Sequence, residues 1–185
     1  MTNWHNLSSL KAKKFQCGFC ASLVASERGY SEGFGSYIFI CPHCQLPTYF
    51  DTHGLQVPGV SPGNEVQHLP TDLASSYKEA RACVAAGAFT ASVLISRKML
   101  MNIAVEQGAT AGGSFVSYVE YLASGGFIPP NGRQWVDHIR KKGNEATHEI
   151  ALMSRGDAEE LILFLEMLLK FIYEFPAKIP QVTKP

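Results

Sequence analysis

Four of the five cysteines form two pairs, Cys17–Cys20 and Cys41–Cys44, which share the spacing C-x2-C and stand twenty residues apart. The two thiolates of such a pair can reach one metal ion from a tight turn, and two pairs complete a closed tetrahedral site. The spacing therefore predicts one structural Zn²⁺ per chain with these four cysteines as its ligands. Two disulfides and a redox-active C-x-x-C are the alternatives, and a reducing cytoplasm would disfavour the disulfides.

A second set of residues that could do chemistry is Arg140, Asn144 and His148, which follow one another in steps of four. On a continuous helix, steps of four place side chains on one face, so the three would form a polar stripe. The histidine can exchange a proton near neutral pH, and the amide and guanidinium groups can hold a phosphate. The alternative is structural, with a basic helix end and a buried core histidine.

Arg97 lies in the apolar stretch VLISRKML, where its neighbours are expected to be buried. An unpaired buried guanidinium would be very unfavourable, so a partner is expected. Glu79, Asp137 and Glu145 are the candidates. In one interpretation Arg97 forms a structural salt bridge or caps a loop, and in the other it supports the polar stripe.

The elements that would position these residues differ along the chain. Aromatic and β-branched residues with glycine-rich turns predict a zinc ribbon over residues 1–54. The lysines at 11, 13 and 14 precede its cysteines; contact with nucleic acid or protein is one interpretation, and a solvated basic turn is the favoured one. Residues 54–70 hold three prolines and three glycines, and 55–70 are predicted to be a linker. Helical periodicity then runs over 71–175, and 176–185 form a flexible tail. The predicted fold is mainly α, a helical bundle with a small N-terminal β ribbon.

The last predicted helix is capped by Asp157 and stopped by Pro176, and its stretch 161–175 is apolar apart from Glu166, Lys170 and Glu174. These three residues follow an i, i+4, i+8 pattern that can face water. A helix this apolar needs cover on most of its surface, which predicts a homodimer through this C-terminal helix. Complete burial inside one chain is the alternative. The charges inside the segment argue against a membrane span, and the N-terminus lacks the apolar region of a signal peptide, so a cytoplasmic protein is expected.

Charge and composition limit the classes of function. The chain has 185 residues, of which 46% are hydrophobic, and this excludes wholesale disorder. Lys and Arg together number 16 and so do Asp and Glu, which gives zero formal net charge. Binding of nucleic acid through overall charge is therefore excluded, and any RNA binding would be local.

Residues 70–175 resemble the bacterial family of domain of unknown function 4145. The resemblance rests on three stretches: YKEARAC at 77–83, AFTASVLISR at 88–97 with Leu100, and IRKKGNEATH at 139–148. A zinc ribbon in front of this domain is a common arrangement in the family. The family is similar to the HEPN (higher eukaryotes and prokaryotes nucleotide-binding) superfamily of small helical bundles, many of which dimerise and many of which are metal-independent ribonucleases. The resemblance thus implies a HEPN-like bundle over 71–175.

The HEPN nuclease motif is Arg-Asn-x-x-x-His, and here Asn144 and His148 match its last two positions. Gly143 stands at the arginine position, with Arg140 one turn earlier as its candidate replacement, and Met101 stands where the family tends to have an acidic residue. The resemblance implies an RNA-binding protein or an endoribonuclease of a bacterial defence or toxin system. His148 would be the general acid or base, while Asn144 and Arg140 would hold the phosphate. The alternative is a non-catalytic dimeric adaptor with a structural zinc and a protein partner at the ribbon.

Overall fold

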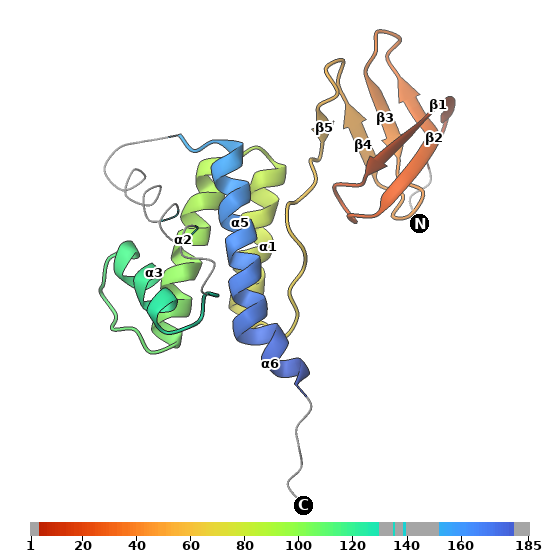
Figure 1. Ribbon diagram of the computed structural model, residues 1–185. Helices are drawn as coiled ribbons and strands as arrows, with labels where there is room; N and C mark the ends of the chain where they lie inside the picture. The colour runs from red at the N-terminus through yellow and green to blue at the C-terminus, as the bar shows by residue number, and fades with distance from the viewer. Residues whose placement is uncertain (1–3, 130–134, 136–138, 140–151, 180–185) are drawn as a thin grey trace, which may run out of the picture. The chain divides into compact units, whose positions relative to one another are not determined.

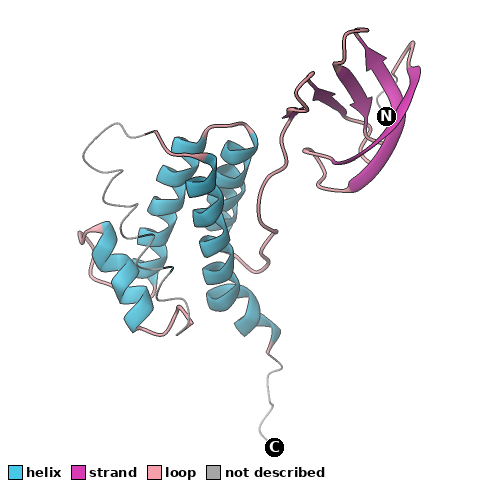
Figure 2. Ribbon diagram, turned by 45° about the horizontal axis from the view of Figure 1, so that its top comes forward, coloured by secondary structure: helices cyan, strands magenta, loops and turns pink. Residues whose placement is uncertain are grey.

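The computed structural model describes residues 4–129, 135, 139 and 152–179 (Figure 1). The chain divides into two compact units. The first unit comprises Met1–Ser61 with Ala85–Gly87, and the second comprises Pro62–Val84 with Ala88–Pro185. Strands belong to the first unit and the helices lie almost entirely in the second (Figure 2). No helix among the described residues is long and apolar enough to cross a membrane.

The first unit is a five-stranded antiparallel sheet in which consecutive strands are neighbours, in the order β1-β2-β3-β4-β5. The strands are β1 (Ser8–Gln16), β2 (Leu23–Ser31), β3 (Tyr37–Ile40), β4 (Pro47–Phe50) and β5 (Gln56–Val57). One cluster of buried side chains stabilises the unit, formed by Phe15, Phe39 and Phe50 together with Cys17 and Cys41. The rings of Phe15 and Phe50 meet edge to face, with centroids 5.3 Å apart.

The prediction of a mainly α fold is wrong, because this sheet makes the chain a mixed α and β protein. The prediction underestimated β1 and β2, which have nine residues each. The lysines at 11, 13 and 14 belong to β1 and not to a turn. β1 is an edge strand, where charged side chains facing water are favoured and hide the apolar alternation on which a strand prediction depends.

The second unit contains α1 (Thr71–Ala85), α2 (Phe89–Glu106), α3 (Phe115–Ser124) and α5 (Arg155–Leu169). A π-helical turn, η2 (Lys170–Glu174), and the short α6 (Phe175–Lys178) continue α5. α1, α2 and α5 run side by side (Figures 1 and 2). Ser114 caps α3, and Ser154 caps α5 in a reciprocal capping box with Asp157. All four longer helices contribute to one apolar core.

A segment of irregular chain, residues 62–67, lies along the helices of the second unit, and we call it the strap. On the side of α1, the Arg81 side chain donates hydrogen bonds to the carbonyl oxygens of Pro62 (2.7 Å) and Gly63 (2.9 Å). The Tyr77 hydroxyl donates to the carbonyl of Asn64 at 3.1 Å. These bonds satisfy backbone acceptors that would otherwise be left without partners beside the helices.

On the side of α5, two carboxylates accept hydrogen bonds from the strap. Glu166 accepts both the backbone N–H (2.8 Å) and the side-chain amide (2.9 Å) of Asn64. Glu174 accepts the backbone N–H of Gln67 at 3.0 Å. Both glutamates are buried. The expectation that the Glu166–Lys170–Glu174 stripe faces water is therefore wrong for the two glutamates, because the strap covers them.

Candidate metal centre

The first cysteine pair lies in a tight turn between β1 and β2. The backbone N–H of Ala21 donates to the carbonyl of Cys17 at 2.8 Å, and the Cys17 N–H donates to the carbonyl of Ser22 at 2.9 Å. Ala21 has a left-handed backbone, with φ of 55°. The turn folds the chain back on itself, so that Cys17 and Cys20 bring their sulfur atoms to one place.

The second pair repeats this geometry between β3 and β4. The N–H of Gln45 donates to the carbonyl of Cys41 at 2.9 Å, and the Cys41 N–H donates to the carbonyl of Leu46 at 3.0 Å. Gln45 also has a positive φ, of 61°. The two turns are thus equivalent, each with a cysteine as first residue and a left-handed residue four positions later.

The two turns bring the four sulfur atoms together. The Sγ atoms of Cys17 and Cys44 lie 3.7 Å apart, those of Cys20 and Cys41 lie 3.8 Å apart, and all four lie within 4.8 Å of one another. All four are free thiols, and these distances are far beyond the bond length of about 2.05 Å in a disulfide. Four sulfurs at about 2.3 Å from a central Zn²⁺ have tetrahedral edges of about 3.8 Å. The cluster can therefore hold a metal ion, and its spacing fits zinc.

The pKa values of the thiols indicate that the four cysteines would not all be ionised unless a cation were bound between them. Burial raises the pKa of Cys17, and it raises the pKa of Cys44 to about 12. At Cys20 burial also acts to raise the pKa, but hydrogen bonds from Ser22 and His43 outweigh it and bring the pKa to about 6. Four thiolates without a cation would repel one another, whereas a bound divalent metal deprotonates a coordinating thiol.

The chain that follows β5 packs against the first turn of this centre. A Cβ atom at Gly18 would collide with the carbonyl oxygens of Pro58 and Gly59. The Gln56 side chain donates to the carbonyls of Gln16 (2.8 Å) and Pro58 (3.1 Å), which ties the two segments together. Gly18 is therefore required for close packing of the two segments.

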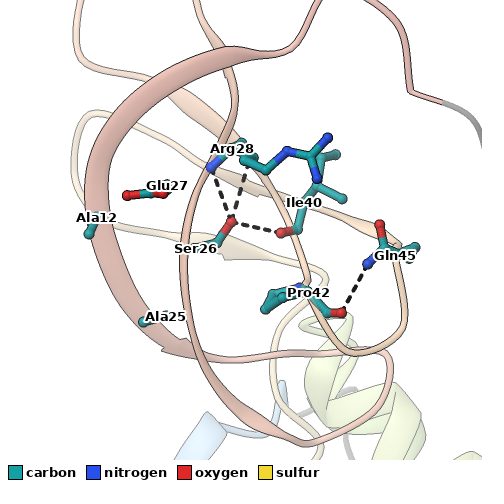
Figure 3. Close-up of a pocket in the computed structure, with 8 residues that line it drawn as sticks. All are labelled: Ala12, Ala25, Ser26, Glu27, Arg28, Ile40, Pro42 and Gln45. Atoms are coloured by element: carbon teal, nitrogen blue, oxygen red, sulfur yellow. Dashed lines mark hydrogen bonds between the residues drawn. The ribbon is translucent and has the colours of Figure 1, made fainter.

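A hollow of about 460 Å³ lies beside the second turn, and Figure 3 shows the residues around it. It lies where β1 bulges away from β2. Ser9 pairs with Arg28 and Lys13 pairs with Ser26, so the three residues of β1 between these pairs lie opposite a single residue of β2. The Ser26 hydroxyl donates to the Ile40 carbonyl at 2.7 Å and fixes the floor. The lining residues are Ala12, Ala25, Ser26, Glu27, Arg28, Ile40, Pro42 and Gln45.

Comparison with known proteins concerns the second unit. A family model described as domain of unknown function (DUF4145) matches residues 78–184, which is more than half of the chain. The chain belongs to the DUF4145 family. No curated protein and no solved structure matches the chain significantly. The four-cysteine centre and the strap both precede the matched range.

The polar stripe predicted within the DUF4145 domain, Arg140, Asn144 and His148, lies outside the described residues. Two residues just before it are described. Ile139 is buried in the core, and Trp135 packs edge to face on Phe164, with ring centroids 5.2 Å apart.

Arg97 in α2 of the DUF4145 domain is half-buried. Its guanidinium lies over the ring of Phe115, 4.5 Å from the centroid, and burial lowers its pKa. Phe115 is the first residue of α3, so this cation–π contact joins two helices of the domain. The sequence interpretation considered only acidic partners, of which Asp137 and Glu145 lie outside the described residues.

The strap was missed entirely by the sequence interpretation, which assigned its residues to a linker. Its acceptors Glu166 and Glu174 lie inside the DUF4145 match, about one hundred residues after the donors. The one local signal was Gly63, which has φ of +69° and whose added Cβ would meet Glu166 Oε2 at 2.8 Å. Such a glycine indicates that the backbone packs closely against a side chain from a distant part of the sequence.

Proposed function

We propose that this protein is a binding module whose N-terminal sheet is stabilised by one structural Zn²⁺ and presents a surface for a protein partner. The observation that carries the proposal is the closed set of four cysteine sulfurs with tetrahedral spacing. Cys17, Cys20, Cys41 and Cys44 would hold the ion. Four thiolate ligands leave no position for water or substrate, so the ion would supply folding energy and no chemistry.

Features of the sheet unit support a role in binding. Large apolar side chains are exposed on it, among them Phe19 (51%), Leu23 (66%) and Phe34 (88%). The hollow with Arg28 and Glu27 at its wall adds a charged, concave feature (Figure 3). Phe19 lies in the first cysteine turn and Leu23 directly follows it, so an ion that stabilises this turn would also hold these two side chains in place for a protein partner. The free thiols also favour a reducing compartment, and we propose a cytoplasmic location on this ground.

The experiment that tests this proposal is replacement of the metal by Co²⁺, whose visible absorption reports ligand type and geometry. We expect one equivalent of zinc in protein purified without added metal, and a tetrahedral thiolate spectrum after cobalt substitution. Added azide should leave this spectrum unchanged, because a closed site has no open position. A spectrum that shifts with azide, or zinc well below one equivalent in folded protein, would contradict the proposal.

A second candidate function is cleavage of RNA by the DUF4145 domain. It is favoured by the Asn144 and His148 spacing and by the similarity of that spacing to the HEPN nuclease motif. In this candidate His148 moves the proton, while Asn144 and Arg140 hold the phosphate. Gly143 at the arginine position argues against it, and for this reason we place it second.

This candidate is tested with a panel of structured and unstructured RNAs. If the protein cleaves RNA, His148→Ala should lower the rate about 10²–10⁴-fold while zinc content and the melting transition stay unchanged. Asn144→Ala should have a smaller effect. A wild-type protein that cleaves none of the RNAs, or a His148→Ala variant with unaltered cleavage, would reject the candidate.

A further inference from the structure

Each cysteine turn presents a backbone N–H to the sulfur of its second cysteine. In the first turn the N–H of Ser22 donates to Cys20, and in the second turn the N–H of Leu46 donates to Cys44. Hydrogen bonds of this kind stabilise a thiolate, because the donor places positive charge beside it. The two peptide groups that carry these N–H groups are therefore part of the surroundings on which metal binding depends.

In the first turn, a side chain holds the other side of this peptide group. The N–H of Ser22 shares its peptide group with the carbonyl of Ala21, and that carbonyl accepts a hydrogen bond from the side-chain amide of Gln16 at 3.0 Å. Because a peptide group is planar, a bond that fixes its carbonyl also fixes the direction of its N–H. Gln16 thus directs the N–H of Ser22 toward the sulfur.

The second turn has the same arrangement, but its donor comes from a distant part of the sequence. The indole N–H of Trp4 donates to the carbonyl of Gln45 at 2.8 Å, across 41 positions, and this carbonyl shares its peptide group with the N–H of Leu46. Tyr30 of β2 holds Trp4 in place: the two rings meet edge to face with centroids 6.5 Å apart, and the Tyr30 hydroxyl donates to the carbonyl of His5. The segment before β1 is therefore attached to the second cysteine turn.

Both held carbonyls belong to the residue whose backbone is unfavourable. Ala21 and Gln45 have φ of 55° and 61°, a left-handed conformation that residues with a Cβ rarely adopt. A turn that contains such a residue can relax when nothing holds it. Relaxation would rotate the peptide group that follows this residue and turn its N–H away from the sulfur.

We infer that Trp4 and Gln16 are positioning residues of the metal centre, and that each acts on one cysteine through a single peptide group. Trp4 orients the N–H that donates to Cys44, and Gln16 orients the N–H that donates to Cys20. The inference rests on the proposed function, because it requires a metal ion at the four cysteines. It extends the centre beyond the cysteine motif to the segment that precedes β1.

The competing explanation is that these two side chains only anchor neighbouring parts of the chain. The two explanations differ in what they predict at the sulfur atoms. Anchoring predicts a general loss of sheet stability when either side chain is changed. Positioning predicts that each change affects one cysteine and leaves the other as it was.

The first measurement is the rate at which an excess of a coloured chelator removes zinc from the full-length protein. Trp4→Phe keeps an aromatic ring against Tyr30 and removes the indole N–H, while Gln16→Met removes the amide. Each change should weaken zinc binding about 10-fold or more, because loss of groups that orient metal ligands typically costs about 10–100-fold in affinity. The matched control is Trp135→Phe, the same change in the helical unit, where the ring packs on Phe164. This control should leave the rate unchanged.

The second measurement separates positioning from anchoring. The protein is loaded with the NMR-active isotope of cadmium, a metal that thiolate sites also bind. This nucleus couples to an amide proton through an N–H···S hydrogen bond, so the coupling reports each bond separately. Trp4→Phe should reduce the coupling to the N–H of Leu46 and leave that of Ser22 unchanged, whereas Gln16→Met should do the reverse.

Asp51→Ala is the control for a general loss of stability. Asp51 Oδ1 accepts the backbone N–H groups of His53 (2.9 Å) and Leu55 (2.7 Å) in the turn that follows β4, whereas the second cysteine turn precedes β4. This change should therefore destabilise the sheet and leave both cadmium couplings unchanged.

The couplings in the wild-type protein are measured first and need no variant. Bound cadmium without coupling to Ser22 or Leu46 would overturn the inference, and so would a folded Trp4→Phe protein with the wild-type rate and couplings. Equal reduction of both couplings by either variant would show that the side chains only anchor the chain, which overturns it as well. In all these cases the wild-type protein still holds its metal. A wild-type sheet that folds without metal would instead reject the proposed metal-stabilised function, and the inference with it.

Discussion

The two units of the molecule are held together by different means. In the sheet unit the buried cluster has five members, and two of them are the cysteines Cys17 and Cys41. In the helical unit the buried cluster has twenty-one members among the described residues, all of them apolar in character. A small unit whose core consists partly of cysteines that could hold a metal has little hydrophobic burial to rely on, whereas the helical unit has much more.

The two units also differ in the sequence separation of the contacts that stabilise them. The sheet unit is closed by two turns that each span six residues, and its strands pair with their neighbours in sequence. The helical unit adds the strap, whose bonds join Asn64 to Glu166 across 102 positions. Loss of metal should therefore affect one unit, and changes at the strap should affect the other.

The largest expected effect is that of metal removal. Structural zinc supplies about 10–16 kcal/mol of apparent binding energy in small domains, which exceeds their folding stability. We expect a strong chelator, or the double change Cys17→Ser with Cys41→Ser, to unfold the sheet unit while helical ellipticity at 222 nm persists. Two-dimensional NMR spectra would show loss of the dispersed strand signals alone.

The control for metal removal is Cys83→Ser. Cys83 is a free cysteine in α1 and does not belong to the sulfur cluster, so its change should leave the metal content and the sheet intact. If chelation melted both units together, their stabilities would be coupled and the comparison would fail.

The next effect is at the strap. Glu166→Ala removes the acceptor of two bonds from Asn64 and the ion-pair partner of Lys170. Hydrogen bonds to a charged group contribute about 1.5–3 kcal/mol, so we expect the helical unit to lose about 2–3 kcal/mol of unfolding free energy. Urea unfolding followed by the 222 nm signal measures it.

The matched variant for Glu166 is Glu159→Ala on the same helix. Glu159 pairs with Arg155 at an exposed position, so its loss should change the free energy of unfolding by less than about 1 kcal/mol. Equal effects of the two changes would mean that the strap adds no stability. In both variants the zinc content should stay at the wild-type value.

The strap should also make the helical unit sensitive to acid. Burial alone would raise the pKa of Glu166, but the hydrogen bonds of Lys170 and Asn64 outweigh it and the pKa is lowered. Lys178 and Gln67 lower the pKa of Glu174. A lowered folded pKa gives stability that is present above the ordinary glutamate value of about 4.3 and is lost as pH falls below it.

This acid sensitivity is measured by comparing wild type with Glu166→Gln, which cannot titrate at that position. The difference in melting temperature of the helical unit should be largest near pH 7 and should shrink below about pH 4. A difference that stays constant from pH 7 to pH 3 would show that Glu166 is not responsible.

The two units also differ in how far their structures follow from the sequence. The clustering of the four cysteines was predicted from the sequence, because both pairs use local spacing and chemistry that few other patterns imitate, whereas the zinc ion itself stays a proposal. The strands β1 and β2 were underestimated, since exposed charged residues interrupt their apolar alternation: Lys11 and Lys14 in the edge strand β1, and Glu27 in β2. The DUF4145 family was identified by resemblance, and the match of its family model confirms this identification.

What could not be predicted is mostly non-local. Nothing near Asn64 in the sequence announces Glu166 as its acceptor, and nothing near Arg97 announces the ring of Phe115. The strap covers the helix face that carries Glu166 and Glu174. Because the strap was not predicted, this face was wrongly expected to be exposed to water. The roles of Arg140, Asn144 and His148 stay predictions.

The smallest expected effect concerns the fit of the strap at one glycine. Gly63 has φ of +69°, and an added Cβ would lie 2.8 Å from Glu166 Oε2 and 3.1 Å from the Tyr77 hydroxyl. Gly126 in the same unit has φ of +78° with nothing within 4 Å of an added Cβ. Alanine at either position meets the same left-handed strain, but only at Gly63 must it displace the strap.

Gly63→Ala should therefore lower the free energy of unfolding by about 1 kcal/mol more than Gly126→Ala does. Urea denaturation of both variants measures the difference, and it should shrink in the Glu166→Ala background, where the nearest contact is gone. An equal loss in the two variants would show that the strap can shift freely, and the strap would then add no measurable stability to the apolar core of the helical unit.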